Sequence, residues 1–129
     1  MGTWTAEQLT FLHDVEEVRI APLREDGSAW PGRLIWVLEL DGRVFVRSWK
    51  GAHAEWYERA MVTKRAHLTM DGAKGGGDFT AAVSLHPDDD PATAAAIDAE
   101  FLRKYGEPYA KEMNLPLAAE TTVELLPLD

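Results

Sequence analysis

The sequence has no cysteine, and its basic residues are few for its length. Without cysteine, disulfides, thiolate catalysis and cysteine zinc sites are excluded, and the composition fits a reducing compartment. No apolar run approaches the roughly 18 residues that cross a bilayer. The segment from Met1 to Thr5 lacks the basic and apolar regions of a secretory signal. We therefore expect a cytoplasmic protein with no membrane partner.

Charge of one sign is also scarce. Thirteen Lys and Arg stand against 22 Asp and Glu, a net charge of −9. Because duplex-binding proteins neutralise phosphates with basic side chains, this balance predicts no nucleic-acid partner. Nine of the basic residues fall between Arg19 and Arg65 with six acidic ones, so this stretch carries +3. Such a concentration favours a small-anion site; the alternative is a set of charged strand edges that prevent aggregation.

The most informative structural signal is an Asp-Gly pair between two apolar segments. Residues 34–40 and 44–48 flank Asp41-Gly42, which is typical of a hairpin. If the second segment alternates as a strand does, Arg47 and Trp49 share one face and Ser48 lies on the other.

Helices and further strands follow from capping and periodicity. Thr5 and Gln8 form a capping box before an expected helix. We expect helices over residues 6–13, 52–62 and 92–105, a helical turn over 109–113, and strands over 18–23, 65–70, 79–85 and 121–126. Strands joined by hairpins pair antiparallel. The sequence therefore predicts a mainly β (α+β) fold, a six-stranded antiparallel split β-barrel with flanking helices, forming a single domain over residues 1–129.

Generic catalytic motifs are missing. The Gly-rich residues 72–77 precede Asp78 and a strand rather than Lys-Ser/Thr and a helix, so we interpret them as a hairpin tip and not a phosphate loop. The four histidines are scattered without metal-ligand spacing, and no serine lies in a Gly-x-Ser-x-Gly elbow. The sequence predicts no metal site and identifies no catalytic residue.

A candidate binding constellation follows the hairpin. Two basic side chains, a hydroxyl and a glycine lie where a strand gives way to a helix, a place that favours anions. Two large aromatics follow and could stack on a flat ring; the alternative is that they belong to the core. The residues are Arg47, Ser48, Trp49, Lys50 and Gly51, then Trp56 and Tyr57.

These residues resemble the deazaflavin-dependent nitroreductase family, which has a strand ending in Ser-Lys-Gly-Gly and then a Trp-Tyr helix. The whole chain, over residues 3–128, is more similar to the domain-of-unknown-function family 2255. That similarity rests on Trp4-Thr5, on residues 19–27 (Arg-Ile-Ala-Pro-Leu-Arg-Glu-Asp-Gly), on Asp90-Pro91 and on Lys104-Tyr105-Gly106. Both groups are associated with the split β-barrel fold of flavin-binding reductases.

The resemblance implies a cofactor site. It assigns Lys50, Gly51, Ser48 and Arg47 to the cofactor phosphate. From the residues themselves we expect Trp49 or Trp56 to form a wall for the ring. Arg24 and Ser28, in the turn after the first strand, match further phosphate contacts. Asp26 stands where that family has a basic residue, and the loop from Lys50 to Trp56 is shorter. The resemblance also implies a homodimer with the cofactor across its interface.

We therefore expect a protein that binds FMN or a deazaflavin coenzyme and transfers hydride to a small substrate. The alternative is a non-redox split barrel that binds another small anionic ligand or serves as a protein-interaction module without cofactor. A cofactor-free isomerase or cyclase would need His53, Glu55 or Tyr57 as acid or base.

Overall fold

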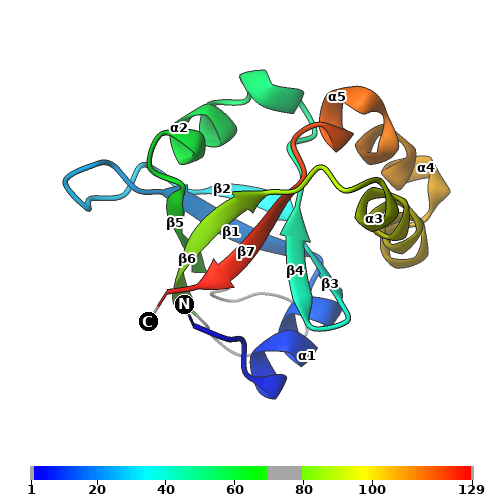
Figure 1. The fold of residues 1–129 in the computed structure, drawn as a ribbon, viewed down its shortest axis with the longest axis horizontal. Helices are drawn as coiled ribbons and strands as arrows, with labels where there is room; N and C mark the ends of the chain where they lie inside the picture. The colour runs from blue at the N-terminus through cyan, green and yellow to red at the C-terminus, as the bar shows by residue number, and fades with distance from the viewer. Residues whose placement is uncertain (1, 70–79, 129) are drawn as a thin grey trace.

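A computed structural model describes residues 2–69 and 80–128 of the chain (Figure 1). The elements are α1 (Ala6–Asp14), β1 (Glu17–Pro22), β2 (Arg33–Trp36), β3 (Leu38–Leu40), β4 (Arg43–Val46), η1 (Gly51–His53), α2 (Glu55–Thr63), β5 (Arg65–Thr69), β6 (Thr80–Pro87), α3 (Pro91–Tyr105), α4 (Glu107–Ala110), η2 (Lys111–Asn114), α5 (Pro116–Ala119) and β7 (Val123–Pro127). The expected tip over residues 72–77 lies outside the described residues.

The seven strands of the described residues form one antiparallel sheet in the order β2-β1-β5-β6-β7-β4-β3. Its two end strands, β2 and β3, are consecutive in the chain and are separated only by Val37. Because one residue joins the two ends of the order, the sheet curls round until it nearly closes into a barrel. The expected antiparallel split barrel with flanking helices is confirmed, with seven strands where the sequence predicted six.

The extra strand arises at Val37, inside the segment 34–40 that the sequence predicts as one strand. The Val37 amide donates to the Tyr105 hydroxyl at 3.3 Å, and its carbonyl accepts from the Lys104 ammonium at 2.6 Å. Both partners belong to α3. The chain bends here because side chains of a distant helix satisfy the backbone groups that a strand neighbour would otherwise satisfy.

The second strand of the hairpin is shorter than expected. β4 ends at Val46, where the prediction continued to residue 48, and both Arg47 and Ser48 are buried while Trp49 is exposed. The reason lies in the segment before β7, because the Ser48 amide donates to the Thr121 hydroxyl at 2.7 Å instead of to a strand. The expected alternation through Trp49 is therefore wrong.

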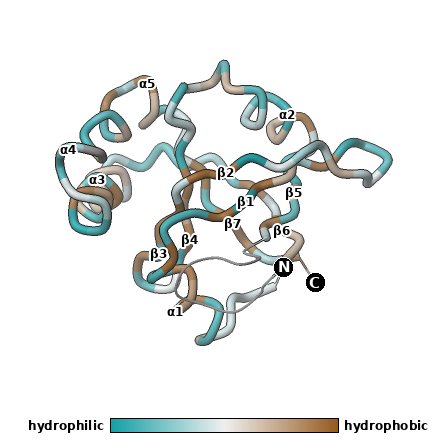
Figure 2. The backbone as a smooth tube through the Cα atoms, turned by 180° about the vertical axis from the view of Figure 1, so that it is seen from behind, coloured by the Kyte–Doolittle hydropathy of each residue, from teal (hydrophilic) through white to brown (hydrophobic). Residues whose placement is uncertain are grey.

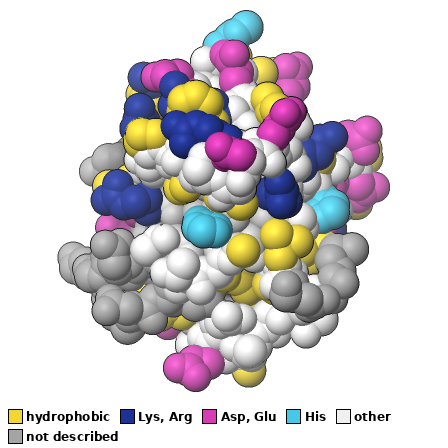
Figure 3. All heavy atoms as spheres, turned by 90° about the vertical axis from the view of Figure 1, so that its left-hand side faces the viewer, with side chains coloured by type: hydrophobic (Ala, Val, Ile, Leu, Met, Phe, Trp, Pro, Cys, Tyr) yellow, Lys and Arg dark blue, Asp and Glu magenta, His cyan; other side chains and the backbone are white. Residues whose placement is uncertain are grey.

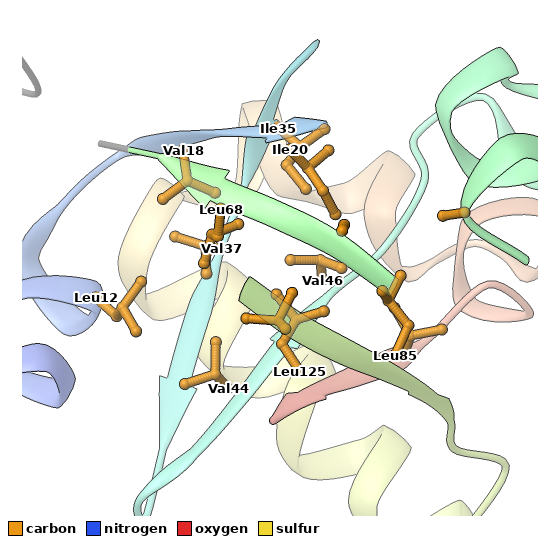
Figure 4. Packing of buried hydrophobic residues seen from close by; sticks show 14 of the residues in the cluster. Leu12, Val18, Ile20, Ile35, Val37, Val44, Val46, Leu68, Leu85 and Leu125 are labelled. Carbon is orange, nitrogen blue, oxygen red and sulfur yellow. The ribbon is translucent and has the colours of Figure 1, made fainter. Parts of the chain in front are cut away.

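Two apolar clusters lie on the two faces of the sheet. The larger fills the barrel, where strand residues point toward one another (Figure 4), and it includes Leu12 of α1 and Ala60 of α2. The smaller packs Phe45 and Leu38 against Ile97 and Phe101 of α3. Hydrophobic residues accordingly concentrate along the strands in Figure 2. Residues of β4 are thus buried on both faces.

The helices begin and end close to the expected positions. The capping box is present, since the Thr5 hydroxyl accepts from the Gln8 backbone amide and the Gln8 side-chain oxygen accepts from the Thr5 backbone amide. The helix expected over 52–62 is split into η1 and α2, and the turn expected over 109–113 extends into α4, η2 and α5. No helix within the described residues has the length and apolar character needed to cross a bilayer.

Candidate functional site

A cavity of about 610 Å³ lies beside β2, the end strand of the sheet. Its walls come from all four residues of β2, from residues 47–50 after β4, from the start of α2, and from the α4–η2 segment. This volume falls in the range of small-ligand sites, roughly 300–1,000 Å³. Five of the nine predicted site residues line it, namely Arg47, Ser48, Trp49, Lys50 and Trp56.

Arg47 is the largest fully buried side chain in the described chain. Its Nε donates to the Thr122 hydroxyl at 2.7 Å, and its Nη1 donates to Asp98 Oδ1 at 2.6 Å and to the Met113 carbonyl at 3.0 Å. Nη2 is buried and has no hydrogen-bond partner. Nε and Nη1 of this guanidinium therefore bond to other parts of the protein, and Nη2 is a buried donor that lacks an acceptor.

Ser48 and Gly51 form a tight turn between β4 and α2. The Ser48 hydroxyl donates to the Gly51 carbonyl at 2.7 Å. Gly51 has a positive φ of 77°, and a Cβ built on it would lie 2.6 Å from Leu117 Cδ1. Only glycine fits this position without strain. The Ser48 hydroxyl is thus already bonded within the protein, and Gly51 does not line the cavity.

Lys50 and Trp49 lie at the exposed side of the cavity. Trp49 is 55% exposed, and its Nε1 donates to Glu112 Oε2 at 2.5 Å. The exposed Lys50 ammonium makes no hydrogen bond or ion pair with any part of the chain that the structure describes. It is therefore a cation at the rim that is available to a ligand.

Trp56 and Tyr57 behave differently from each other. Trp56 is 7% exposed, belongs to the barrel core and also lines the cavity. Tyr57 meets it edge-on, with ring centroids 5.8 Å apart, and does not line the cavity. Burial raises the pKa of the Tyr57 hydroxyl. Both aromatics therefore pack against the core, as the alternative interpretation expected, and Trp56 also offers a wall.

Sequence reasoning missed Trp36 and Glu17, which also line the cavity. Their Cα atoms are paired across β1 and β2, so the two side chains lie on the same face. The signal was available in the spacing of Leu34 and Trp36 on one face of the strand. It was hidden because the apolar run 34–40 predicts a strand buried on both sides.

The cavity is mixed in charge. Arg33 Nη2 lies 3.9 Å from Glu55 Oε1, while Arg59 Nη2 donates to Glu55 Oε2 at 2.8 Å. Both oxygens of Glu55 thus face guanidiniums. Glu17 and Glu112 add two more carboxylates to the lining. The expected cluster of cations is accompanied by an equal number of carboxylates.

Arg24 and Ser28 lie elsewhere, and Arg24 lines a second hollow of about 410 Å³ together with Trp30 and Arg59. The Arg24 guanidinium donates to the Ser28 hydroxyl at 3.1 Å, and the guanidiniums of Arg24 and Arg59 both lie about 4 Å from the centroid of the Trp30 ring. Figure 3 shows the face that lies on the left-hand side of Figure 1, and basic and apolar side chains lie side by side in its upper half. Ser28 also donates to Asp26, which lowers the pKa of that carboxyl. The structure does not bring Arg24 and Ser28 to the cavity.

Histidines do not add a metal centre in the part of the chain that is described. Within residues 2–69 and 80–128, no three His, Asp or Glu side chains are grouped so that they could hold a metal ion. His53 is exposed in η1 and does not line the cavity.

A nearly closed antiparallel barrel with outer helices and a cavity at its end strand defines a mainly β split-barrel protein. Its sequence places it in a particular family. The chain belongs to the family described as "uncharacterized protein conserved in bacteria" (DUF2255), whose profile matches residues 8–125. The sequence has no significant match among curated proteins.

Several solved structures have a similar fold. HutZ, the heme storage protein from Vibrio cholerae, matches with a TM-score of 0.65 and 14% identity over 93% of this chain and 87% of that one. A protein from Listeria innocua named for pyridoxamine 5'-phosphate oxidase matches with a TM-score of 0.67 and 12% identity over 94% of this chain and 90% of that one. An F420 reductase matches with a TM-score of 0.61 and 12% identity over 93% of this chain and 92% of that one. At these identities the likeness establishes the fold alone.

Proposed function

We propose that this protein binds a flavin or deazaflavin cofactor, FMN or a coenzyme of the F420 type, in the cavity beside β2, and transfers hydride to a small substrate. The observation that carries the proposal is the unsatisfied Nη2 of Arg47, a fully buried donor on a residue that lines a ligand-sized cavity. A buried donor without an acceptor costs about 1–3 kcal/mol, and an acceptor oxygen that reached it from the cavity would recover this free energy. The similarity in fold to an F420 reductase and to a protein named for pyridoxamine 5'-phosphate oxidase supports the same interpretation.

The residues fit such a group in three respects. Lys50 is an exposed cation without an ionic partner in the described chain, Arg47 offers one buried donor, and Trp49 and Trp56 provide apolar walls. Lys50 would attract the phosphate by a charge-assisted hydrogen bond. The bound cofactor would supply the hydride chemistry, and the protein would supply position and electrostatics. The roles of Ser48 and Gly51 would be structural, since they shape the turn that presents Lys50.

We also propose that a second copy of the chain covers the cavity, so that the protein is a homodimer. Each subunit would be a single domain, and we propose the cytoplasm as the location of the dimer. Leu34 and Trp49 line the cavity and are 56% and 55% exposed. Exposed apolar side chains that are gathered on one surface, rather than scattered singly, mark a place that another molecule covers.

The experiment is a titration of the purified protein with FMN and with F420, followed by tryptophan fluorescence and cofactor absorbance. We expect binding of one cofactor with Lys50→Ala weakening it by about tenfold or more, because a charge-assisted hydrogen bond is lost. Lys111→Ala is the matched control, since Lys111 is also exposed and does not line the cavity, and it should bind like the parent protein. Negligible binding of both cofactors, or equal binding by Lys50→Ala, would refute the proposal.

A second candidate is a non-redox barrel that binds another small ligand or a protein. The three carboxylates of the cavity, Glu17, Glu55 and Glu112, favour it because they lower the attraction for a phosphate. A protein that binds neither cofactor, yet shows altered tryptophan fluorescence with other small molecules, would support this alternative.

A further inference from the structure

Trp36 forms a flat platform in the cavity wall. One face of its indole is covered by the Tyr105 ring, with centroids 3.9 Å apart and planes 3° from parallel. Trp36 also lines the cavity. Tyr105 covers one face of the indole, and the Phe101 ring also lies near, with its centroid 6.4 Å from that of Trp36, so a planar ligand would stack on the face opposite Tyr105.

The platform is held in place from behind. The Tyr105 hydroxyl donates to the Glu16 carbonyl at 2.5 Å and accepts from the Val37 amide at 3.3 Å. Burial raises the pKa of Tyr105, so this hydroxyl keeps its proton at neutral pH. Trp36 therefore meets a ligand with its orientation already fixed, which lowers the entropy cost of binding.

Carboxylates without an ionic partner lie among the residues around this platform. Glu55 is paired with Arg33 and Arg59, and Arg47 is paired with Asp98. Three lining groups then have no ionic partner within the described residues: Lys50, Glu17 and Glu112. Glu55 neutralises only one of its two arginines, so the lining as a whole is not negative, and the selection of a cation rests on Glu17 beside Trp36.

Glu17 is the carboxylate nearest to the platform by register. It is directly opposite Trp36 in the β1–β2 pair, and residues in that relation have Cβ atoms about 4.5–5.5 Å apart on one face. A cation over the indole face is attracted by the ring quadrupole, and a carboxylate beside the same face adds to that attraction. Glu112 can contribute its second oxygen, because only Oε2 accepts from Trp49.

We propose that Trp36 and Glu17 form a subsite for a planar cation, such as a protonated nitrogen heteroaromatic or an amidinium. The ligand would stack on Trp36 with its N–H groups toward Glu17. This subsite rests on the proposed function only in taking the same cavity as the ligand site. There it would hold the second substrate, while Lys50 would hold the anionic cofactor group.

The test uses three planar probes of nearly the same shape at pH 7: benzamidine, which is cationic, benzamide, which is neutral, and benzoate, which is anionic. Binding is followed through the indole N–H resonances of isotope-labelled protein. We expect benzamidine to bind about tenfold or more tightly than benzoate, with benzamide between them and with the largest shift at Trp36. Glu17→Gln should weaken benzamidine by about fivefold while leaving benzamide unchanged.

Glu7→Gln is the matched control, because it removes the same charge from an exposed residue that does not line the cavity. It should bind benzamidine within about twofold of the parent. Benzoate binding as tightly as benzamidine, no binding of benzamidine, or equal losses in both variants would overturn the inference. The probes require no cofactor, so a failed cofactor titration refutes the proposed function and leaves this result to be judged separately.

Discussion

Arg47 and Asp98 form an ion pair across two very different environments. Arg47 Nη1 lies 2.6 Å from Asp98 Oδ1, yet the arginine side chain is fully buried and that of the aspartate is 40% exposed. The pair ties the end of β4 to α3, while Thr122 and the Met113 carbonyl bind the same guanidinium from the C-terminal segment. Arg47, which the sequence predicts as a cofactor ligand, therefore has a structural role in joining the end of β4 to α3 and to the segment before β7.

Arg47→Met should lower the free energy of unfolding by about 3 kcal/mol, because buried acceptors lose their donor. Arg33→Met is the control. Arg33 is exposed and its contact with Glu55 is long at 3.9 Å, so the loss should stay within about 0.5 kcal/mol. Urea denaturation followed by far-UV circular dichroism measures both, and equal losses would contradict the structural role of Arg47.

Gly51→Ala should be more destabilising than Gly42→Ala. Both glycines have positive φ, 77° and 85°, which costs a non-glycine residue about 1–2 kcal/mol. Only at Gly51 does a Cβ meet another residue, Leu117, so a further 1–3 kcal/mol of overpacking is expected. Thermal and urea unfolding of the two variants give the comparison, and the excess should shrink when Leu117→Ala is added. No difference between the two glycines would rule out the contact.

Tyr105→Phe should cost about 1–2 kcal/mol of unfolding free energy, because the hydroxyl that bonds Glu16 and Val37 is removed while the stacked ring remains. Tyr57→Phe is the matched control, since the structure gives the Tyr57 hydroxyl no partner among the described residues, and it should change stability by less than about 0.5 kcal/mol. If both variants are equally stable, the hydroxyl does not hold the bend at Val37.

Lys104 should make stability depend on alkaline pH. Burial lowers the pKa of Lys104 to about 8 from 10.5, so between these values the unfolded chain binds the extra proton. Stability then rises with pH across that window, and the penalty of a buried charge is fully present below it. The difference in unfolding free energy between the parent protein and Lys104→Met should therefore grow in favour of the parent from pH 7 to pH 10. Lys111→Met, at an exposed position, should show no such trend, and a flat difference for Lys104 would contradict the prediction.

Local patterns predicted the elements well where local chemistry decides them. The Asp41-Gly42 turn and the Thr5 capping box lie where the sequence placed them. The bend at Val37 was beyond prediction, because α3 residues far along the chain satisfy its backbone groups.

The candidate site was also predicted only in part, because some of its residues are positioned by local sequence and others by contacts from residues far along the chain. Lys50 and Trp49 line the cavity because they lie in the four-residue segment between β4 and η1, which the sequence places at the end of a strand. Trp36 was hidden in a continuous apolar run, and its exposure to the cavity depends on β2 being the end strand of the sheet. Arg24 is held away by Trp30 and by its own turn, contacts that no spacing rule indicates.

The single-residue link between β2 and β3 has a consequence for tolerance to change in chain length. One added or deleted residue at Val37 would reverse the facing of every side chain in one of the two strands relative to its neighbours. The turn over residues 24–29 makes no such connection, so it can accept extra residues. Natural variation in length among relatives should therefore avoid the first position and accumulate at the second.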